Sequence, residues 1–277
     1  MHRFMSADGL ALAASTGGDA NLPPVVLLHG GGQTRHSWNN VFDALVTAGH
    51  HVISFDARGH GDSEWDPRGD YSLDAMVADL HVILSSLSSA PILVGASMGG
   101  MTALAAAGKA SKPVARALVL VDVTPRINEE GAKQISAFMR GNIQGFESLE
   151  AAAEAIARYL PHRPRQADSS GLSRNLRKRG NRWFWHWDPL LLDGNTAAQA
   201  QTQARLEACA SALTIPVLLI RGDKSNIVTE QEVEHFIAIA PTAEYLNVRG
   251  AGHMVVGDRN DAFNSGILEF IQRVQRG

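Results

Sequence analysis

Gly95-Ala96-Ser97-Met98-Gly99 is the stretch that best indicates the fold of this chain. It has the pattern G-x-S-x-G, it follows an apolar run at residues 91–94, and it precedes a helix-like run at residues 101–107. A strand, a sharp turn and a helix form the context in which this motif exposes a serine hydroxyl. Glycine is expected at both flanks because a Cβ atom there would collide with the neighbouring strand or helix. The context therefore predicts that Ser97 is a nucleophile.

Composition sets the broad class of the protein. The chain has 277 residues, a formal net charge of −3 and a single cysteine, Cys209. This length suits one domain with an insertion, and the charge gives no basic surface for nucleic acid or a membrane. No run approaches the ~20 apolar residues of a membrane-spanning helix, and the N-terminal residues lack a signal-peptide pattern. We therefore expect a cytoplasmic protein without an internal disulfide that binds neither nucleic acid nor membranes.

Short apolar runs alternate with helical patterns through much of the chain. The runs expected to form strands are residues 25–28, 51–55, 92–94, 117–121, 216–220 and 244–248. Helical patterns occupy residues 38–48, 73–84, 101–107 and 261–274. Continuous apolar strands between helices are typical of a parallel sheet that is covered on both faces. Near the N-terminus, apolar residues on both sides of Asp8-Gly9 predict a hairpin and an antiparallel edge.

The pattern changes between residues 126 and 212. This part carries helical segments at residues 129–140, 149–159, 172–179 and 196–211, and it has no strand run. We therefore expect a core domain made of residues 1–125 and 213–277, interrupted by a helical cap insertion at residues 126–212.

Four motifs in this order resemble those of α/β-hydrolase-fold enzymes. They are His29-Gly30-Gly31-Gly32, Asp56-Ala57-Arg58-Gly59-His60-Gly61-Asp62-Ser63, the serine motif at residues 95–99, and Gly252-His253. Among the subgroups, the chain looks most like small esterases and the related non-haem haloperoxidases. The resemblance implies the α/β-hydrolase fold, with a mostly parallel central sheet, helices on both faces and a helical cap.

The resemblance also implies a set of catalytic roles. A serine hydroxyl needs a base to take its proton, and His253, in a short loop after an expected strand, is the candidate. The order of serine before histidine agrees with this fold. By resemblance, the backbone N–H groups of Gly31 and Met98 meet the oxyanion of the tetrahedral intermediate. His29 is expected to shape the oxyanion loop rather than to transfer a proton.

The acid that orients the histidine has three candidates. The family usually places it three or four positions after the glycine that follows the late strand, where this chain has Ser225 and Asn226. Asp223 is our choice, although it comes early in the loop. Asn226 and Asp122, which ends an earlier strand, remain open as alternatives.

Aromatic residues indicate where a substrate could bind. Trp183, Trp185 and Trp187 would share one side of an extended segment, and Phe138 and Trp38 could join them. They predict either an apolar wall of the substrate pocket or the core of the cap itself. No metal-ligand spacing, P-loop or dinucleotide fingerprint occurs, so we expect no metal and no cofactor.

These observations predict a serine hydrolase that cleaves a small, largely apolar carboxylic ester or lactone through an acyl-enzyme at Ser97. The alternatives are a perhydrolase, carbon–carbon hydrolase or lyase that uses the same site, or a ligand-binding receptor that keeps the fold without turnover. A carboxylate nucleophile would be needed for dehalogenase or epoxide hydrolase chemistry, and position 97 is a serine. The expected partner is the small-molecule substrate, and the sequence gives no oligomeric state.

Overall fold

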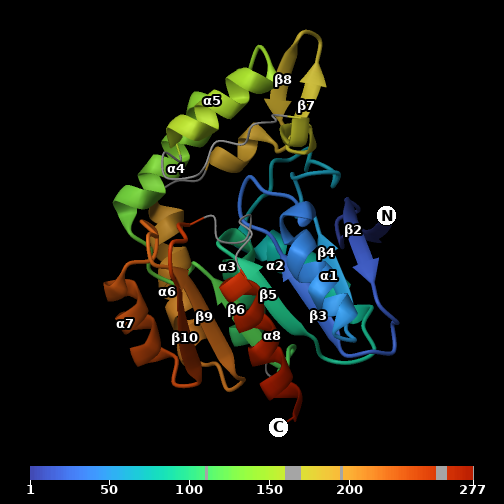
Figure 1. The fold of residues 1–277 in the computed structure, drawn as a ribbon, viewed down its shortest axis with the longest axis vertical. Helices are drawn as coiled ribbons and strands as arrows, with labels where there is room; N and C mark the ends of the chain where they lie inside the picture. The colour runs from blue at the N-terminus through green and yellow to red at the C-terminus, as the bar shows by residue number, and fades with distance from the viewer. Residues whose placement is uncertain (110–111, 160–169, 194–195, 254–260, 277) are drawn as a thin grey trace.

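Eight strands form the central sheet in the order β1-β2-β4-β3-β5-β6-β9-β10 (Figure 1). The structure is a computed structural model, and it describes all residues except 110–111, 160–169, 194–195, 254–260 and 277. The strands of this sheet are β1 (His2–Met5), β2 (Ala11–Gly17), β3 (Pro24–Leu28), β4 (His51–Phe55), β5 (Ile92–Ala96), β6 (Ala117–Val121), β9 (Val217–Gly222) and β10 (Ala243–Val248). The neighbouring strands β4, β3, β5, β6, β9 and β10 all pair in parallel, whereas β2 is antiparallel to both β1 and β4.

Helices cover both faces of this sheet. The α-helices are α1 (Asn39–Thr47), α2 (Leu73–Ser85), α3 (Met98–Lys109), α4 (Glu129–Gly141), α5 (Leu149–Tyr159), α6 (Thr196–Ser211), α7 (Glu230–Ile239) and α8 (Asp261–Arg276). The short 3-10 segments among the described residues are η1 (Arg35–Trp38), η2 (Ser170–Arg174) and η3 (Pro189–Leu192). A separate hairpin consists of β7 (Leu176–Arg179) and β8 (Arg182–Trp185).

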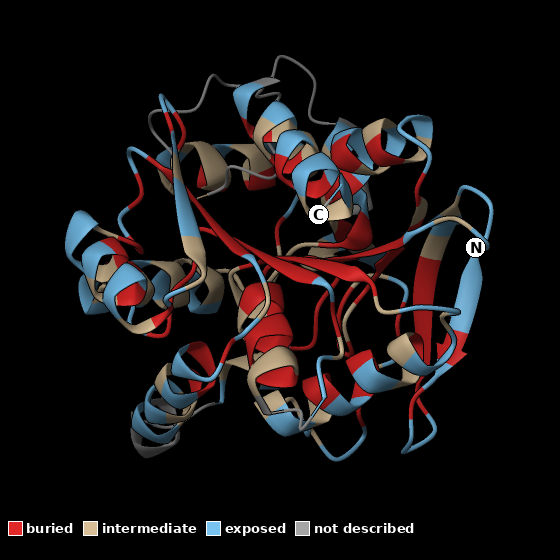
Figure 2. Ribbon diagram, turned by 90° about the horizontal axis from the view of Figure 1, so that it is seen from below, coloured by how far each residue is buried: buried red, intermediate tan, exposed pale blue. Residues whose placement is uncertain are grey.

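The side chains of each strand point alternately to the two faces of the sheet and so build two apolar cores. In β3, Val26 and Leu28 join the core that holds residues of α2, α3, α6 and α7, and Val25 and Leu27 join the core that holds residues of α1 and α8. Successive strand residues point to opposite faces, so a continuously apolar strand fills both cores. Figure 2 shows the result as a buried sheet between two layers of helices. The predicted α/β-hydrolase fold with a mostly parallel sheet and helices on both faces is confirmed.

The expectation that residues 126–212 contain no strand is wrong. The hairpin β7–β8 lies in this part, with Leu176 opposite Trp185 and a two-residue turn at Gly180-Asn181. Gly180 has a φ of 59°, which a tight hairpin turn requires. The predicted helix over residues 172–179 is also wrong, because the spacing of Leu172 and Leu176 imitates one helical face. None of the expected helices corresponds to α7.

The segment from residue 126 to residue 212 contributes to two different cores. Phe146, Ala152, Ala155 and Leu176 form a small core of their own, remote from the sheet. In Figure 1, α4, α5 and the hairpin β7–β8 extend from one end of the molecule. By contrast, α6 packs on α3 and supplies apolar residues to the core beneath the main sheet.

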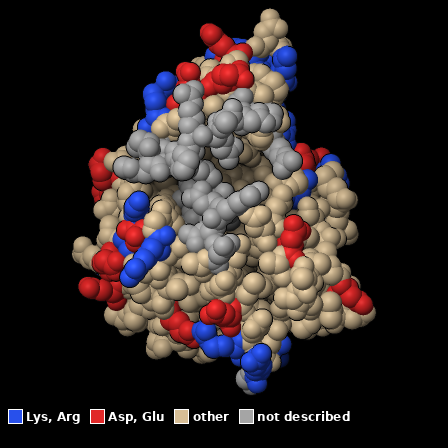
Figure 3. All heavy atoms as spheres, in the orientation of Figure 1, with Lys and Arg blue, Asp and Glu red and all other residues tan. Residues whose placement is uncertain are grey.

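Two features of the described surface bear on the class of protein. The face in Figure 3 carries acidic and basic side chains interspersed, without a field of one sign. Among the described helices, none combines the length and the apolar character needed to cross a bilayer.

Candidate active site

Ser97 occupies a strained turn at the carboxyl end of β5. Its φ is 46°, a left-handed conformation that is costly for a residue with a Cβ atom. Its N–H donates to the carbonyl of Val121 over 3.1 Å, and its own carbonyl accepts from Met101 as α3 begins. The half-buried Ser97 is therefore fixed between β5, β6 and α3, at the edge of the sheet where ligands bind in such folds.

The flanking glycines let this turn pass close to its neighbours. A Cβ atom on Gly95 would come within 2.6 Å of the backbone of Gly100, and one on Gly99 would come within 2.5 Å of the carbonyl oxygen of Leu28. Real Cβ atoms do not approach that closely. As expected, a side chain on Gly95 would collide with α3 and one on Gly99 would collide with β3.

The loop of three glycines after β3, residues 30–32, lies beside Ser97 and is called the glycine loop below. A Cβ atom on Gly30 would lie 3.4 Å from the Cβ of Ser97, and one on Gly31 would lie 4.0 Å from the Sδ of Met98. His29 donates from Nδ1 to the carbonyl of Gly30 over 2.8 Å and accepts the N–H of Ala57 at Nε2 over 2.9 Å. Its ring thus joins the loops after β3 and β4, as expected of a residue that shapes this loop.

His253 and Asp122 form a hydrogen-bonded pair at the same edge of the sheet. The distance from His253 Nδ1 to Asp122 Oδ2 is 2.6 Å. The Asp122 side chain is 1% exposed and that of His253 is 13% exposed. Asp122 follows β6 directly, has a φ of 49°, and donates its N–H to the carbonyl of Ile220. Two residues with left-handed backbone, Ser97 and Asp122, therefore stand at the ends of adjacent strands.

The two other acid candidates make different contacts. Asp223 is exposed, and its Oδ1 accepts the N–H of Gly250 over 2.8 Å. Asn226 is also exposed, and its amide donates to the Oε1 of Gln134 over 2.9 Å. Asp223 follows β9 so closely that its side chain contacts the loop after β10. The geometry thus favours Asp122, which the sequence analysis kept open, over Asp223, which it chose.

Ser225 is a site residue that the sequence analysis did not assign. Its Oγ donates to Asp122 Oδ2 over 2.6 Å and accepts the N–H groups of Ile227 and Val228, each over 3.2 Å. Two donors, His253 and Ser225, therefore meet the same carboxylate oxygen. The signal for this contact was present, since Ser225 stands at one of the two positions where the family usually has its acid.

The aromatic candidates separate into three groups. Trp183, Trp185 and Phe138 pack against the small core of residues 126–212. Trp38 is fully buried in the main core and stacks on Phe263. Trp187 is also buried, and its Nε1 lies 3.7 Å from the place that a Cβ atom on Gly32 would take. Of the five, Trp187 is the one placed against the glycine loop.

Three buried imidazoles connect the loops around the site. The ring centroids of His29 and His60 are 5.0 Å apart, and those of His60 and His186 are 6.0 Å apart. Burial lowers the pKa of His29 to about 4 and the pKa values of His60 and His186 to about 3. Repulsion from a nearby imidazole contributes further to the lowering of each pKa. All three rings are therefore neutral at neutral pH.

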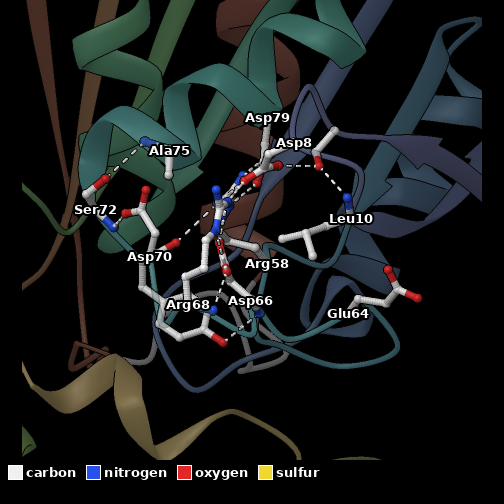
Figure 4. A network of polar contacts seen from close by, with 12 residues as sticks. Asp8, Leu10, Arg58, Glu64, Asp66, Arg68, Asp70, Ser72, Ala75 and Asp79 are labelled. Carbon is white, nitrogen blue, oxygen red and sulfur yellow. Dashed lines mark hydrogen bonds and ion pairs between the residues drawn. The ribbon is translucent and has the colours of Figure 1, made fainter.

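Charged groups around Arg58 also hold the loop after β4 in place (Figure 4). The guanidinium of Arg58 binds Asp79 with two hydrogen bonds of 2.7 Å and also reaches Asp66 and Asp8. Its side chain is 2% exposed. The network thereby ties the loop to α2 and to the turn between β1 and β2. Within the described residues, no three His, Cys, Asp or Glu side chains are grouped so that they could hold a metal ion.

Comparisons with known proteins agree with this geometry. A family model described as alpha/beta hydrolase fold matches residues 23–259. Esterase Rv0045c of Mycobacterium tuberculosis is 33% identical over 275 residues, which cover 96% of this chain and 86% of that protein. The sn-1-specific diacylglycerol lipase ABHD11 of Mus musculus is 30% identical over 266 residues, with coverage of 92% and 82%. These names support the prediction of a hydrolase that acts on ester bonds.

Solved structures show the same architecture. A crystal structure of E-2-(acetamidomethylene)succinate hydrolase has a TM-score of 0.82 at 24% identity and covers 98% of each chain, a likeness of fold alone. A structure of the Mycobacterium tuberculosis esterase Rv0045c has a TM-score of 0.77 at 28% identity and covers 98% of this chain and 91% of that one. The chain therefore belongs to the alpha/beta hydrolase fold family.

Proposed function

We propose that this protein is a serine hydrolase that cleaves small, largely apolar carboxylic esters through an acyl-enzyme on Ser97. The observation that carries the proposal is the hydrogen bond of 2.6 Å between His253 and Asp122, since Asp122 follows the strand that pairs with the strand before the strained Ser97. Lactones are cyclic esters and would follow the same course. The family membership and the names of the esterase and lipase relatives support this reaction class.

The proposed reaction begins with proton transfer from Ser97 to His253. With Nδ1 donating to Asp122, the lone pair of the neutral ring is at Nε2, and this atom takes the proton as the serine oxygen attacks the ester carbonyl. The carboxylate then stabilises the imidazolium. Collapse of the tetrahedral intermediate breaks the bond to the alcohol oxygen, which receives the proton from Nε2. Water, activated by the same nitrogen, afterwards releases the acid and restores Ser97.

The proposed oxyanion donors are the backbone N–H groups of Gly31 and Met98. The glycine loop lies against Ser97 and Met98, within the distances given above. His29 Nδ1 and the N–H of Gln33 both donate to the carbonyl of Gly30. Since a trans peptide has its N–H opposite its C=O, these bonds aim the N–H of Gly31 away from His29. Such fixed donors stabilise charge without reorganisation during the reaction.

We place the substrate-facing wall at the glycine loop. The Cε of Met139 lies 3.4 Å, and the Nε1 of Trp187 lies 3.7 Å, from the place that a Cβ atom on Gly32 would take. Both residues belong to residues 126–212, which we propose act as a cap over the strand ends. Because α6 packs in the main core, we propose that the cap proper ends before α6. A methionine and a tryptophan at this wall favour an apolar group on the substrate.

Hydrolysis of p-nitrophenyl acetate by the parent protein and by Ser97→Ala tests the proposal. We expect turnover in the parent and a loss of at least about 10³-fold in the variant, because the acyl-enzyme cannot form. Thr102→Ser, a change on α3 one turn beyond Met98, is the matched control. Equal turnover in the parent and in Ser97→Ala, or none in the parent, would contradict the proposal, and absence of turnover with intact folding would favour a receptor.

A further inference from the structure

Three consecutive peptide groups of the glycine loop are each bound by a different imidazole. His29 binds the carbonyl of Gly30 over 2.8 Å, His60 Nε2 accepts the N–H of Gly32 over 3.2 Å, and His186 Nε2 donates to the carbonyl of Gly32 over 3.1 Å. Glycine has the greatest backbone freedom of any residue, and Gly32 has a φ of 74°. A run of glycines needs external contacts to keep one conformation, and these imidazoles supply them.

The contacts of His186 require a neutral ring with its proton on Nε2. Its Nδ1 accepts the N–H of Gly61 over 2.7 Å, so Nδ1 carries no proton, and its Nε2 donates to Gly32. The residue is 1% exposed. A protonated ring would have two donors and no acceptor, which would leave the N–H of Gly61 unpaired. Burial, and next the neighbouring His60, lower the pKa of His186 to about 3, in agreement with a ring that is neutral at neutral pH.

His186 belongs to the proposed cap, whereas its partners belong to the main domain. It follows β8 directly, and the same segment makes two further bonds to the loop region after β4. Asp188 donates its N–H to the carbonyl of Gly59 over 2.9 Å and accepts the hydroxyl of Tyr71 over 2.6 Å. Among these bonds of residues 186–188, the one from His186 to Gly32 is made to the glycine loop itself.

We infer that His186 is a positioning residue through which the cap sets the conformation of the glycine loop. The inference rests on the proposed function, since it concerns the N–H of Gly31 that we assign to the oxyanion. Both ring nitrogens of His186 bind backbone groups, so neither is available to the substrate or to Ser97. It fixes the peptide group after Gly32, while His60 fixes the one before it, so that the preceding N–H of Gly31 keeps its direction. The cap then completes the catalytic apparatus as well as covering it.

Two substitutions separate the bonds of His186. The amide of glutamine reaches the place of Nε2 and can donate to Gly32, whereas the amide of asparagine reaches only the place of Nδ1 and can accept from Gly61. We expect His186→Asn to lower kcat at least about tenfold with a much smaller change in KM, because a misdirected oxyanion donor acts on the transition state. We expect His186→Gln to retain kcat to within about threefold of the parent, since it restores the bond to Gly32.

A transition-state analogue provides the readout that a merely structural role would not change. A trifluoromethyl ketone adds to Ser97 and places an oxyanion at the proposed donors. Its inhibition constant should rise in His186→Asn by the same factor as kcat falls, and it should stay near the parent value in His186→Gln. Tyr71→Phe is the matched control, because it removes another bond of the same cap segment and leaves Gly32 untouched. We expect it to lower the melting temperature without changing kcat.

Equal losses in His186→Asn and His186→Gln, or a change in KM alone, would overturn the inference. A nitrogen-15 NMR spectrum of the imidazoles in the parent protein adds a test that needs no variant. We expect His186 to show a protonated Nε2 and a bare Nδ1 from pH 5 to pH 8, and a charged ring or the other tautomer would also overturn the inference. A parent without ester hydrolysis or adduct would refute the proposed function, whereas an active parent with a fully active His186→Asn would refute the positioning role alone.

Discussion

His253 and His186 are the same kind of side chain in two opposite environments. His253 stands at the strand ends, partly exposed, and donates to a carboxylate. His186 stands where the cap meets the loops, buried, and both of its nitrogens bind backbone groups. A carboxylate stabilises an imidazolium, whereas an N–H donor aimed at a ring nitrogen excludes the proton from it. The first environment permits proton transfer, and the second holds backbone in place.

This difference separates the groups proposed to react from the groups that position them. The strand ends carry Ser97, Asp122 and His253, and their arrangement follows from the sheet. The loops and the cap carry His29, His60 and His186, which are neutral and engaged with backbone. Changes at the strand ends should therefore act on the rate, and changes that charge the buried imidazoles should act on stability.

Replacement by asparagine should distinguish Asp122 from Asp223 through its effect on kcat. In a Ser-His-Asp triad, replacing the aspartate by asparagine lowers kcat by about 10⁴. We expect a loss of this order in Asp122→Asn, measured as kcat for p-nitrophenyl acetate, and a change of less than about threefold in the matched variant Asp223→Asn. A large loss of kcat in Asp223→Asn with a small loss in Asp122→Asn would instead assign the acid to Asp223.

The buried charges around Arg58 provide a contrast with the neutral imidazoles. In Arg58→Met the carboxylates of Asp79, Asp66 and Asp8 lose their shared cation, so we expect the free energy of unfolding to fall by about 3–5 kcal/mol. Urea unfolding measures this change. Arg68 binds two of the same carboxylates but its side chain is 63% exposed, so Arg68→Met should cost less than about 1 kcal/mol. Similar losses in the two variants would show that burial does not determine how much each arginine contributes to the free energy of unfolding.

Acid should destabilise the protein through the buried imidazoles. Their pKa values in the folded protein, about 4 for His29 and about 3 for His60 and His186, lie below the ordinary value of 6.5. The unfolded chain therefore binds more protons, and the free energy of unfolding falls as the pH falls below 6.5 until it reaches the folded pKa values. Between pH 7 and 5.5 we expect a loss of about 1 kcal/mol for each ring, or about 3 kcal/mol together.

Urea unfolding at several pH values measures this loss. His186→Gln should reduce the pH dependence by the share of one ring, and His36→Gln, at an exposed position, is the matched control. A free energy of unfolding that stays constant between pH 7 and 5.5 would show that these rings accept protons in the folded protein.

Ser225→Ala should lower kcat much less than Asp122→Asn does. Its hydroxyl donates to the carboxylate oxygen that also receives the proton of His253 Nδ1. Ser225→Ala removes one of these two bonds and leaves the carboxylate in place, so we expect kcat to fall about tenfold, or about 1.4 kcal/mol. Ser225→Thr keeps a hydroxyl and should recover most of the rate. A loss as large as that of Asp122→Asn would mean that the two residues act as one unit.

The sequence predicted the parts of the fold that depend on local patterns. The strands of the central sheet, α5 and α6 follow from apolar runs and helical spacing, and the position of Ser97 follows from one motif in its context. The hairpin β7–β8 was missed because Leu172 and Leu176 have helical spacing, while its pairing with Trp185 is a contact across a turn. Pairing across a turn is not encoded in the apolar spacing of one short segment.

The site shows the same limit. Ser97, His253 and the glycine loop are recognisable by motif, but the pairing of His253 with Asp122 joins residues 131 positions apart. The contacts of His186 with Gly61 and Gly32 span 125 and 154 positions. No local pattern marks such partners, because they are brought together by the sheet order and by the docking of the cap.

Labelling by a fluorophosphonate probe tests whether Ser97 is a nucleophile that the His253–Asp122 pair activates. The probe reacts with an activated serine, peptide mass spectrometry locates the adduct, and the rate of labelling reports activation by the base. We predict an adduct on Ser97 in the parent and a rate lower by at least about 10³-fold in His253→Gln, because the general base is lost. An adduct on another residue, or an unchanged rate in His253→Gln, would contradict a Ser97 nucleophile activated by the His253–Asp122 pair.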